Sequence, residues 1–150
     1  MNEPAAKLQG AIERAAPLLR KIDDAAASRR PAPGKWSQKE ILGHLIDSAA
    51  NNHQRFVRAQ LQTDLRFPGY EQDGWVRVQD HADAPWRGLV ELWLHYNLHL
   101  ARIAGKIPPE RLGIRCRIGE GEETTLGLLI EDYVRHLEHH LRQLLPDFSA

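Results

Sequence analysis

The sequence has little of several features that would define a class of protein. Its 150 residues include one cysteine, Cys116, so no disulfide can form within the chain. A chain without disulfides suits a reducing compartment. No stretch approaches 18 apolar residues, so we expect no membrane span, and residues 1–4 do not begin the basic and apolar pattern of a signal peptide. We therefore expect a cytoplasmic protein without a membrane partner.

An excess of charge of one sign is also missing. Twenty Lys and Arg residues balance twenty Asp and Glu residues. Binding to a nucleic-acid backbone needs a concentrated basic surface, so we expect no nucleic-acid partner. The arginine-rich segment Arg111–Arg117 is most simply a solvated loop. A nucleophilic role for Cys116, inside that segment, would have only Arg115 and Arg117 to support it.

The length and composition fit one ordinary globular domain spanning residues 1–150. A chain of this size buries roughly 68–70% of its unfolded surface. Apolar residues make up 42% of the sequence, which is enough for a full hydrophobic core. We find no internal repeat and no low-complexity tract.

Four segments show the apolar period of a helix. A capping box at Ser37 and Glu40 marks the start of the second helix, and Pro17 should kink the first helix rather than end it. Strand signals are weak, so an all-α four-helix bundle is the predicted fold. The predicted helices span about residues 3–26, 37–62, 83–105 and 124–145.

A long connection of about residues 63–83 separates the second and third predicted helices. Loops of that length are usually functional or disordered. This one contains Phe67, Tyr70 and Trp75, which is too aromatic a composition for disorder. We predict a loop packed across one end of the bundle, where Tyr70 and Trp75 could wall a pocket.

A polar stripe on the second helix needs an explanation. His44, Asp47, Asn51 and Arg55 are spaced i, i+3, i+7 and i+11, and apolar residues flank this face. Buried polar groups cost free energy unless they are paired or bind a ligand. We therefore expect this stripe to belong to a site.

The fourth helix carries a second polar line that includes Tyr133, His136, His140 and Gln143. His136 and His140 are four residues apart, so both rings can reach one ion. His139 lies about 160° from the centre of the apolar face, at about 100° per residue, and should face solvent. Another pair at this spacing, His95 and His99 on the third helix, is predicted to be solvated.

These two lines predict a metal site formed by His44, His136 and His140. Three neutral imidazoles suit Zn, Ni or Fe(II) better than Ca or Mg. Three protein ligands leave coordination positions open for water or substrate. The His-Glu-x-x-His motif of zinc proteases is absent, because residues 136–140 read His-Leu-Glu-His-His, and no phosphate-binding loop or Ser-His-Asp pattern is recognisable.

Three motifs, in this order, resemble those of the DinB/YfiT-like metal-dependent bundles. The likeness extends from about Trp36 to Leu144. It consists of a second-helix motif with matching His, Asp-Ser, Asn and Arg-Phe, a Tyr-Glu and Trp in the following loop, and a closing-helix motif in which the outer two of three histidines bind metal. The matching residues are His44, Asp47, Ser48, Asn51, Arg55, Phe56, Tyr70, Glu71, Trp75, Tyr133, His136, His139 and His140.

The resemblance implies an up-down-down-up four-helix bundle, often a homodimer, with a Zn or Ni ion on three histidines. Members of the family include metal-dependent hydrolases and transferases of low-molecular-weight thiols such as bacillithiol or mycothiol. Because the members differ in chemistry, the resemblance leaves the reaction open.

The first functional hypothesis is an enzyme that activates water or a small thiol at the metal and attacks a small electrophilic substrate. Asp47 could orient His44 or act as a base, while Asn51 and Arg55 could bind an anionic group of the substrate. Interhelical hydrogen bonds and an ion pair are the structural alternatives, and for Arg55 the ion pair is favoured.

Two further hypotheses involve no catalysis. A binding module would close the coordination sphere with a fourth protein ligand such as Asp47 or His53. Alternatively, the histidines could be hydrogen-bonded core residues with no metal at all.

Overall fold

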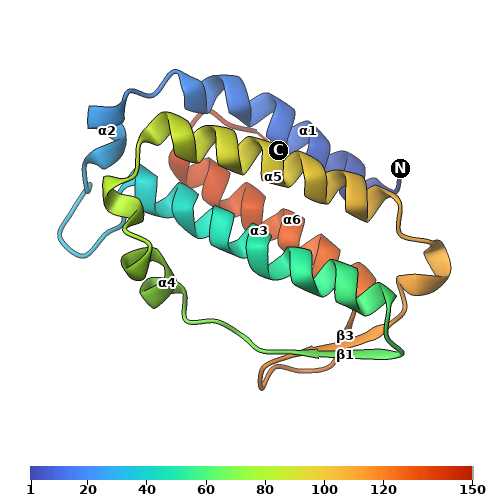
Figure 1. Ribbon diagram of the computed structural model, residues 1–150. Coiled ribbons are helices and arrows are strands. Elements are labelled where there is room, and N and C mark those ends of the chain that lie inside the picture. The colour runs from blue at the N-terminus through green and yellow to red at the C-terminus, as the bar shows by residue number, and fades with distance from the viewer. Residues whose placement is uncertain (150) are drawn as a thin grey trace.

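Four long helices packed side by side form the body of the computed structural model, which describes residues 1–149 (Figure 1). In Figure 1, α1 and α6 run in one direction and α3 and α5 run in the other. The predicted up-down-down-up order is therefore confirmed. Each of α1 and α3 packs against both α5 and α6, so the four helices form a closed ring. Their bounds are α1 Glu3–Arg20, α3 Gln38–Gln60, α5 Trp86–Gly105 and α6 Leu126–Leu144.

The apolar faces of these helices meet in one hydrophobic core. Its largest side chains are fully buried, and they come from every helix of the ring. Burial of such side chains is the main favourable contribution to folding. No helix within residues 1–149 is both long and apolar enough to cross a membrane. Core residues from the four helices include Ile12, Phe56, Trp93, Leu100, Ile130 and Leu137.

The first predicted helix is wrong at its C-terminal end. It was expected to continue to about residue 26, but α1 ends at Arg20, one turn after Pro17, and a separate short helix, α2 (Asp24–Ser28), follows. The carboxylate of Asp23 accepts a hydrogen bond from the backbone N–H of Ala26 at 2.7 Å. Aspartate in this position starts a new helix rather than extending an old one, which explains the break.

Both ends of α3 have identifiable caps. At the start, the capping box is confirmed: Glu40 N donates to Ser37 Oγ at 3.2 Å, and Ser37 N donates to Glu40 Oε1 at 3.1 Å. At the end, Arg111 Nη2 donates to the carbonyls of Gln60 and Gln62, both at 2.8 Å. The prediction of a solvated loop is therefore wrong for Arg111, although Arg115 and Arg117 are exposed.

The connection between α3 and α5 must run the length of the bundle, because these two helices are parallel. With 23 residues, α3 is about 35 Å long at about 1.5 Å per residue. The connection is long, as predicted, but it runs along the bundle rather than across one end, and it has regular structure. It contains a strand, a two-turn helix and a 3-10 helix: β1 (Asp64–Phe67), α4 (Gln72–Val78) and η1 (His81–Asp83).

A small sheet packs against α3 and α6, and the weak strand signals did not predict it. Strand β2 (Arg115–Ile118) pairs in parallel with β1, and β3 (Thr124–Thr125) pairs antiparallel with β2. The strands have only two to four residues, and β1 pairs with a strand far away in the sequence, so the local patterns are weak. The bundle remains a mainly helical fold.

Cys116 is buried in this sheet. Its side chain lies in β2, opposite Leu65, and is 1% exposed. Burial, with a smaller contribution from Asp64, raises the pKa of the thiol to about 11. A buried thiol with a raised pKa is a poor nucleophile, so the structure does not support the nucleophile alternative.

The capping box provides a test of the fold. Ser37→Ala removes the acceptor for the N–H of Glu40, and we expect it to lower the free energy of unfolding by about 1 kcal/mol, measured by urea denaturation. Ser28→Ala is the matched control, because its exposed hydroxyl bonds only to a carbonyl within α2, and it should change stability by less than about 0.5 kcal/mol. Equal effects of the two substitutions would contradict the capping role.

Candidate metal centre

Three histidines converge at one end of the bundle. His44 lies in the first half of α3, and His136 and His140 lie in the last two turns of α6. Because α3 and α6 are antiparallel neighbours, the start of one lies beside the end of the other (Figure 1). One ring nitrogen from each histidine lies within 4.8 Å of those of the other two. The sequence predicted this convergence.

The distances within the group suit a common ion. His44 Nε2 and His136 Nε2 are 3.1 Å apart, and the ring centroids of His140 lie 4.9 Å from those of His44 and 4.6 Å from those of His136. Two nitrogens bound to one zinc ion at about 2.0–2.1 Å lie about 3 Å apart. The residues present therefore fit a divalent metal with nitrogen preference.

Contacts with neighbouring residues orient two of the three rings. His140 Nδ1 lies 2.8 Å from Gln143 Oε1. A carboxamide oxygen can only accept, so Nδ1 carries the proton and Nε2 keeps its lone pair for a ligand. The ring of Trp36 packs on His44, with 5.1 Å between the ring centroids. Gln143 was part of the predicted polar line, whereas Trp36 was not expected to contact the site.

Burial keeps the group neutral. The pKa values of His44 and His136 are lowered to about 4, first by desolvation and then by the neighbouring histidines. Desolvation also lowers the pKa of His140, against an opposing effect of its bond to Gln143. Neutral imidazoles are the form that binds metal, so the free protein is already in the binding form at neutral pH.

The histidines that were predicted to face solvent do so. His139 is exposed although it stands next to His140 in the sequence, and His95 and His99 are exposed on α5. Among residues 1–149, the metal-ligating group contains neither of the proposed fourth ligands, Asp47 and His53. His53 instead lies with its Nδ1 2.8 Å from the hydroxyl of Tyr96.

Asp47 is buried beside the histidines but bonds to other groups. Its Oδ1 accepts from Gln79 Nε2 at 2.7 Å and from His81 Nε2 at 3.2 Å. Its Oδ2 is buried and has no hydrogen-bond partner within the described residues. Asp47 therefore does not hydrogen-bond to His44, and the predicted orienting role is not seen.

The contact with His81 explains a glycine in α3. A Cβ atom added to Gly43 would lie 2.3 Å from Cγ of His81. Glycine therefore lets the ring of His81 reach the helix and dock η1 against it. Neither Gln79 nor His81 belongs to a periodic segment, so no sequence pattern indicates this contact.

Asn51 and Arg55, the other two predicted site residues, have different surroundings. Asn51 Nδ2 donates to the backbone carbonyl of Asp47 at 2.9 Å, which occupies its amide within α3. Arg55 lines a cavity of about 320 Å³ that also contains Asn52 and His136. The cavity thus contacts Asn52 rather than the predicted Asn51.

The centre lies between two cavities. The cavity of about 320 Å³ reaches His136 and includes Tyr70, as predicted, but not Trp75, which packs on Tyr70. A second cavity, of about 490 Å³, reaches His140 and is lined by Trp36 and Gln143. Small molecules therefore have space on both sides of the three histidines.

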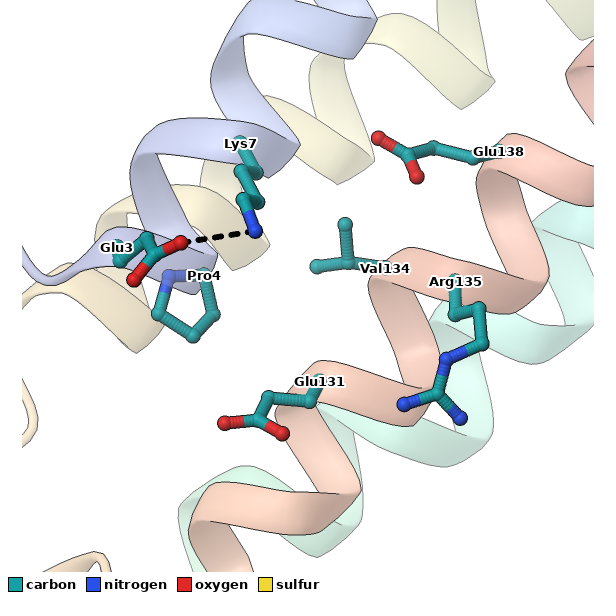
Figure 2. A pocket seen from close by; sticks show the side chains of 7 residues that line it. All are labelled: Glu3, Pro4, Lys7, Glu131, Val134, Arg135 and Glu138. Atoms are coloured by element: carbon teal, nitrogen blue, oxygen red, sulfur yellow. Dashed lines mark ion pairs between the residues drawn. The ribbon is translucent and has the colours of Figure 1, made fainter. Parts of the chain in front are cut away.

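A further cavity, of about 320 Å³, lies between α1 and α6 and contains none of the three histidines. Figure 2 shows its lining, with Lys7 directed to the carboxylate of Glu3 at 2.8 Å. Glu131 and Glu138 project into the same space from α6. Within the described residues its carboxylates do not form a group that could hold a metal ion, so we do not assign the site here.

The lowered pKa values predict acid sensitivity of the metal-free protein. Between pH 6.5 and 4, the unfolded chain binds protons at positions 44 and 136 that the folded chain does not bind, so the free energy of unfolding should fall as the pH falls through this window. Urea denaturation of chelator-treated protein measures this loss. His136→Ala should make the pH dependence shallower, and His95→Gln, at an exposed position, should not. An equally steep dependence in both variants would contradict the assignment.

Two curated relatives have names that refer to metal-dependent hydrolysis. A protein of Oceanobacillus iheyensis, provisionally named a metal-dependent hydrolase, is 19% identical over 144 residues, which cover 96% of this chain and 83% of the relative. A protein of Bacillus mycoides with the same provisional name is 26% identical over 128 residues, covering 82% and 72% of the two chains.

Two solved structures share the fold. YfiT from Bacillus subtilis, described as a probable metal-dependent hydrolase with an unusual four-helix bundle topology, superposes with a TM-score of 0.82 at 18% identity, covering 95% of this chain and 84% of YfiT. The mycothiol-dependent maleylpyruvate isomerase gives a TM-score of 0.76 at 11% identity, covering 95% of this chain and 59% of the isomerase. At these identities the structures establish the fold.

The family itself follows from a sequence profile. The profile of the DinB superfamily matches residues 7–144, which include most of α1, the other three long helices and the three histidines. The resemblance seen in the motifs is thereby confirmed, and the chain belongs to the DinB superfamily.

Proposed function

We propose that this protein is a metal-dependent enzyme that holds one divalent ion, Zn or Ni, on His44, His136 and His140. The observation that carries the proposal is the convergence of three neutral imidazoles between two cavities. Such an ion supplies Lewis acidity, which makes a coordinated water or thiol nucleophilic near neutral pH. Imidazole ligands favour Zn and Ni over Ca and Mg. The names of the relatives support a hydrolytic or thiol-dependent reaction.

The surrounding residues have distinct parts in this proposal. Gln143 holds the proton on His140 Nδ1 and so presents its Nε2. Gln79 and His81 donate to Oδ1 of Asp47 and hold this buried carboxylate in place beside the centre. The Asp47 carboxylate also acts on His44, since its charge raises the pKa that burial lowers.

The non-catalytic alternative receives less support. It requires a fourth protein ligand that closes the coordination sphere, but within residues 1–149 the ligating group includes neither Asp47 nor His53. An open position next to a cavity is the arrangement of a catalytic rather than a structural zinc site.

Metal content is the first test. The purified protein should contain about one divalent ion per chain by elemental analysis, and a His136→Ala, His140→Ala double variant should contain almost none, because one imidazole cannot hold the ion. His139→Ala is the matched control, since this exposed residue stands in the same turn, and it should retain the metal. Equal metal content in the double variant and the wild type would overturn the proposed centre.

Thiol dependence separates the two reactions. The metal-loaded protein is incubated with 1-chloro-2,4-dinitrobenzene, with and without cysteine, and the products are identified by mass spectrometry. A thioether formed above the rate of the double variant assigns S-transfer, and a thiol-independent phenol assigns hydrolysis. Product formation that does not exceed the rate of the double variant in either condition would contradict an enzymatic role on this class of electrophile.

A further inference from the structure

Arg55 is a buried cation without a partner. The residue is 9% exposed, and its Nε is fully buried with no hydrogen bond within residues 1–149. The ion pair that the sequence favoured is absent from the described residues. Its described contact is with an aromatic ring, since the guanidinium carbon lies 5.6 Å from the centroid of Phe67. A buried charge is costly unless something compensates it, so this arginine calls for an external anion.

Arg55 lines the cavity that reaches His136. Arg55 and His136 both line this space of about 320 Å³, between α3 and α6. Tyr70 contributes a hydroxyl, and the charges of Tyr70 and Arg55 affect each other's titration, which places the two groups close together. One cavity therefore joins a free cation to a predicted metal ligand.

The acidic group at this cavity is already neutralised. Asp132 is the acidic residue among the described lining residues, and its Oδ1 accepts from Arg135 Nη1 at 2.7 Å. Asp132 and Arg135 are both exposed, whereas Arg55 is not. The place beside Arg55 is thus free for an anion that enters with a ligand.

The remaining lining defines the rest of that ligand. Leu129 and Ile118 supply apolar surface, and Tyr133 supplies a ring whose hydroxyl is occupied by Asn97. A volume of about 320 Å³ is at the lower end for small-molecule pockets. The ligand should be small and should have an apolar or aromatic body between its anionic group and its reactive atom.

We propose that Arg55 binds the carboxylate of a small apolar acid, so that the body of the acid lies along the cavity toward His136. The inference rests on the proposed function, because it treats the bound acid as the electrophilic substrate of the three-histidine centre. A carboxylate fits better than a phosphate, since the cavity offers one cation, whereas a phosphate carries about −1.5 to −2 charges and needs more donors. The planar guanidinium can bind a carboxylate through two parallel hydrogen bonds.

Benzoate binding to chelator-treated protein tests the subsite without any contribution of metal. Isothermal titration calorimetry compares wild type, Arg55→Met and Arg58→Met. Arg58 is the matched control, because it also lies over Phe67, at 6.0 Å, but is exposed and bonds to Gln54. Arg55→Met should weaken benzoate about 10- to 100-fold, the loss of a charge-assisted bidentate contact, and Arg58→Met should leave the affinity within about twofold.

Two further ligands test the chemistry of the group that binds. Benzamide, which has the same body without the charge, should bind the wild type at least about tenfold more weakly than benzoate. Tighter binding of phenyl phosphate than of benzoate would overturn the carboxylate assignment. The absence of saturable benzoate binding to the wild type, or equal affinities of wild type and Arg55→Met, would overturn the subsite itself.

Stability separates a binding role from a packing role. Removing an uncompensated buried charge while keeping an unbranched side chain should leave the melting temperature of Arg55→Met at or above that of the wild type. A lowered melting temperature with unchanged benzoate affinity would assign Arg55 to packing against Phe67 and contradict the proposal. Because these measurements use metal-free protein, they can fail while the metal-content test succeeds, or succeed while it fails.

Discussion

The burial of three imidazoles between α3 and α6 is the constraint on which the rest of the site depends. Desolvation keeps His44 and His136 uncharged at neutral pH, and each ring further disfavours a proton on its neighbours. Three positively charged rings could not occupy this space. Burial of these polar rings costs folding free energy, but it also keeps them neutral. It therefore preserves the nitrogen lone pairs that bind a metal. In the sequence, this arrangement is visible as a polar stripe on the inward face of a helix.

The topology of the bundle connects this constraint to the long crossover. Because α3 and α5 are parallel, the chain must return along the bundle after α3, and α4 and η1 lie on that return path. They dock onto α3 near the histidines through Gln79 and His81, which both bond to Asp47. Gly43 leaves room for this contact. A connection required by helix direction thus also supplies contacts around the candidate centre.

Within the described residues Arg55 has no ion-pair partner, and this absence points to a binding site. Most buried charges in proteins are paired, and an unpaired one lowers stability. Such a residue persists where function needs it, at a stability cost borne by the rest of the fold. The cavity beside Arg55 continues to His136, so the free charge and one candidate metal ligand line the same space. The metal would provide the reactivity, and the arginine would select which molecules reach it.

Much of this protein was determined by local sequence. The capping box at Ser37 and Glu40, the helical periods and the spacing of His136 and His140 are properties of a few neighbouring residues, so they predicted the four helices and the candidate ligands. The sheet, the partners of Asp47 and the isolation of Arg55 depend on segments far apart in the chain, such as β1 with β2 or η1 with α3. Periodicity places a residue on a helix face but does not say what lies opposite that face. Only the tertiary packing decided that Arg55 has no ion pair among residues 1–149 and that Cys116 is buried, because both facts depend on which distant surfaces exclude water.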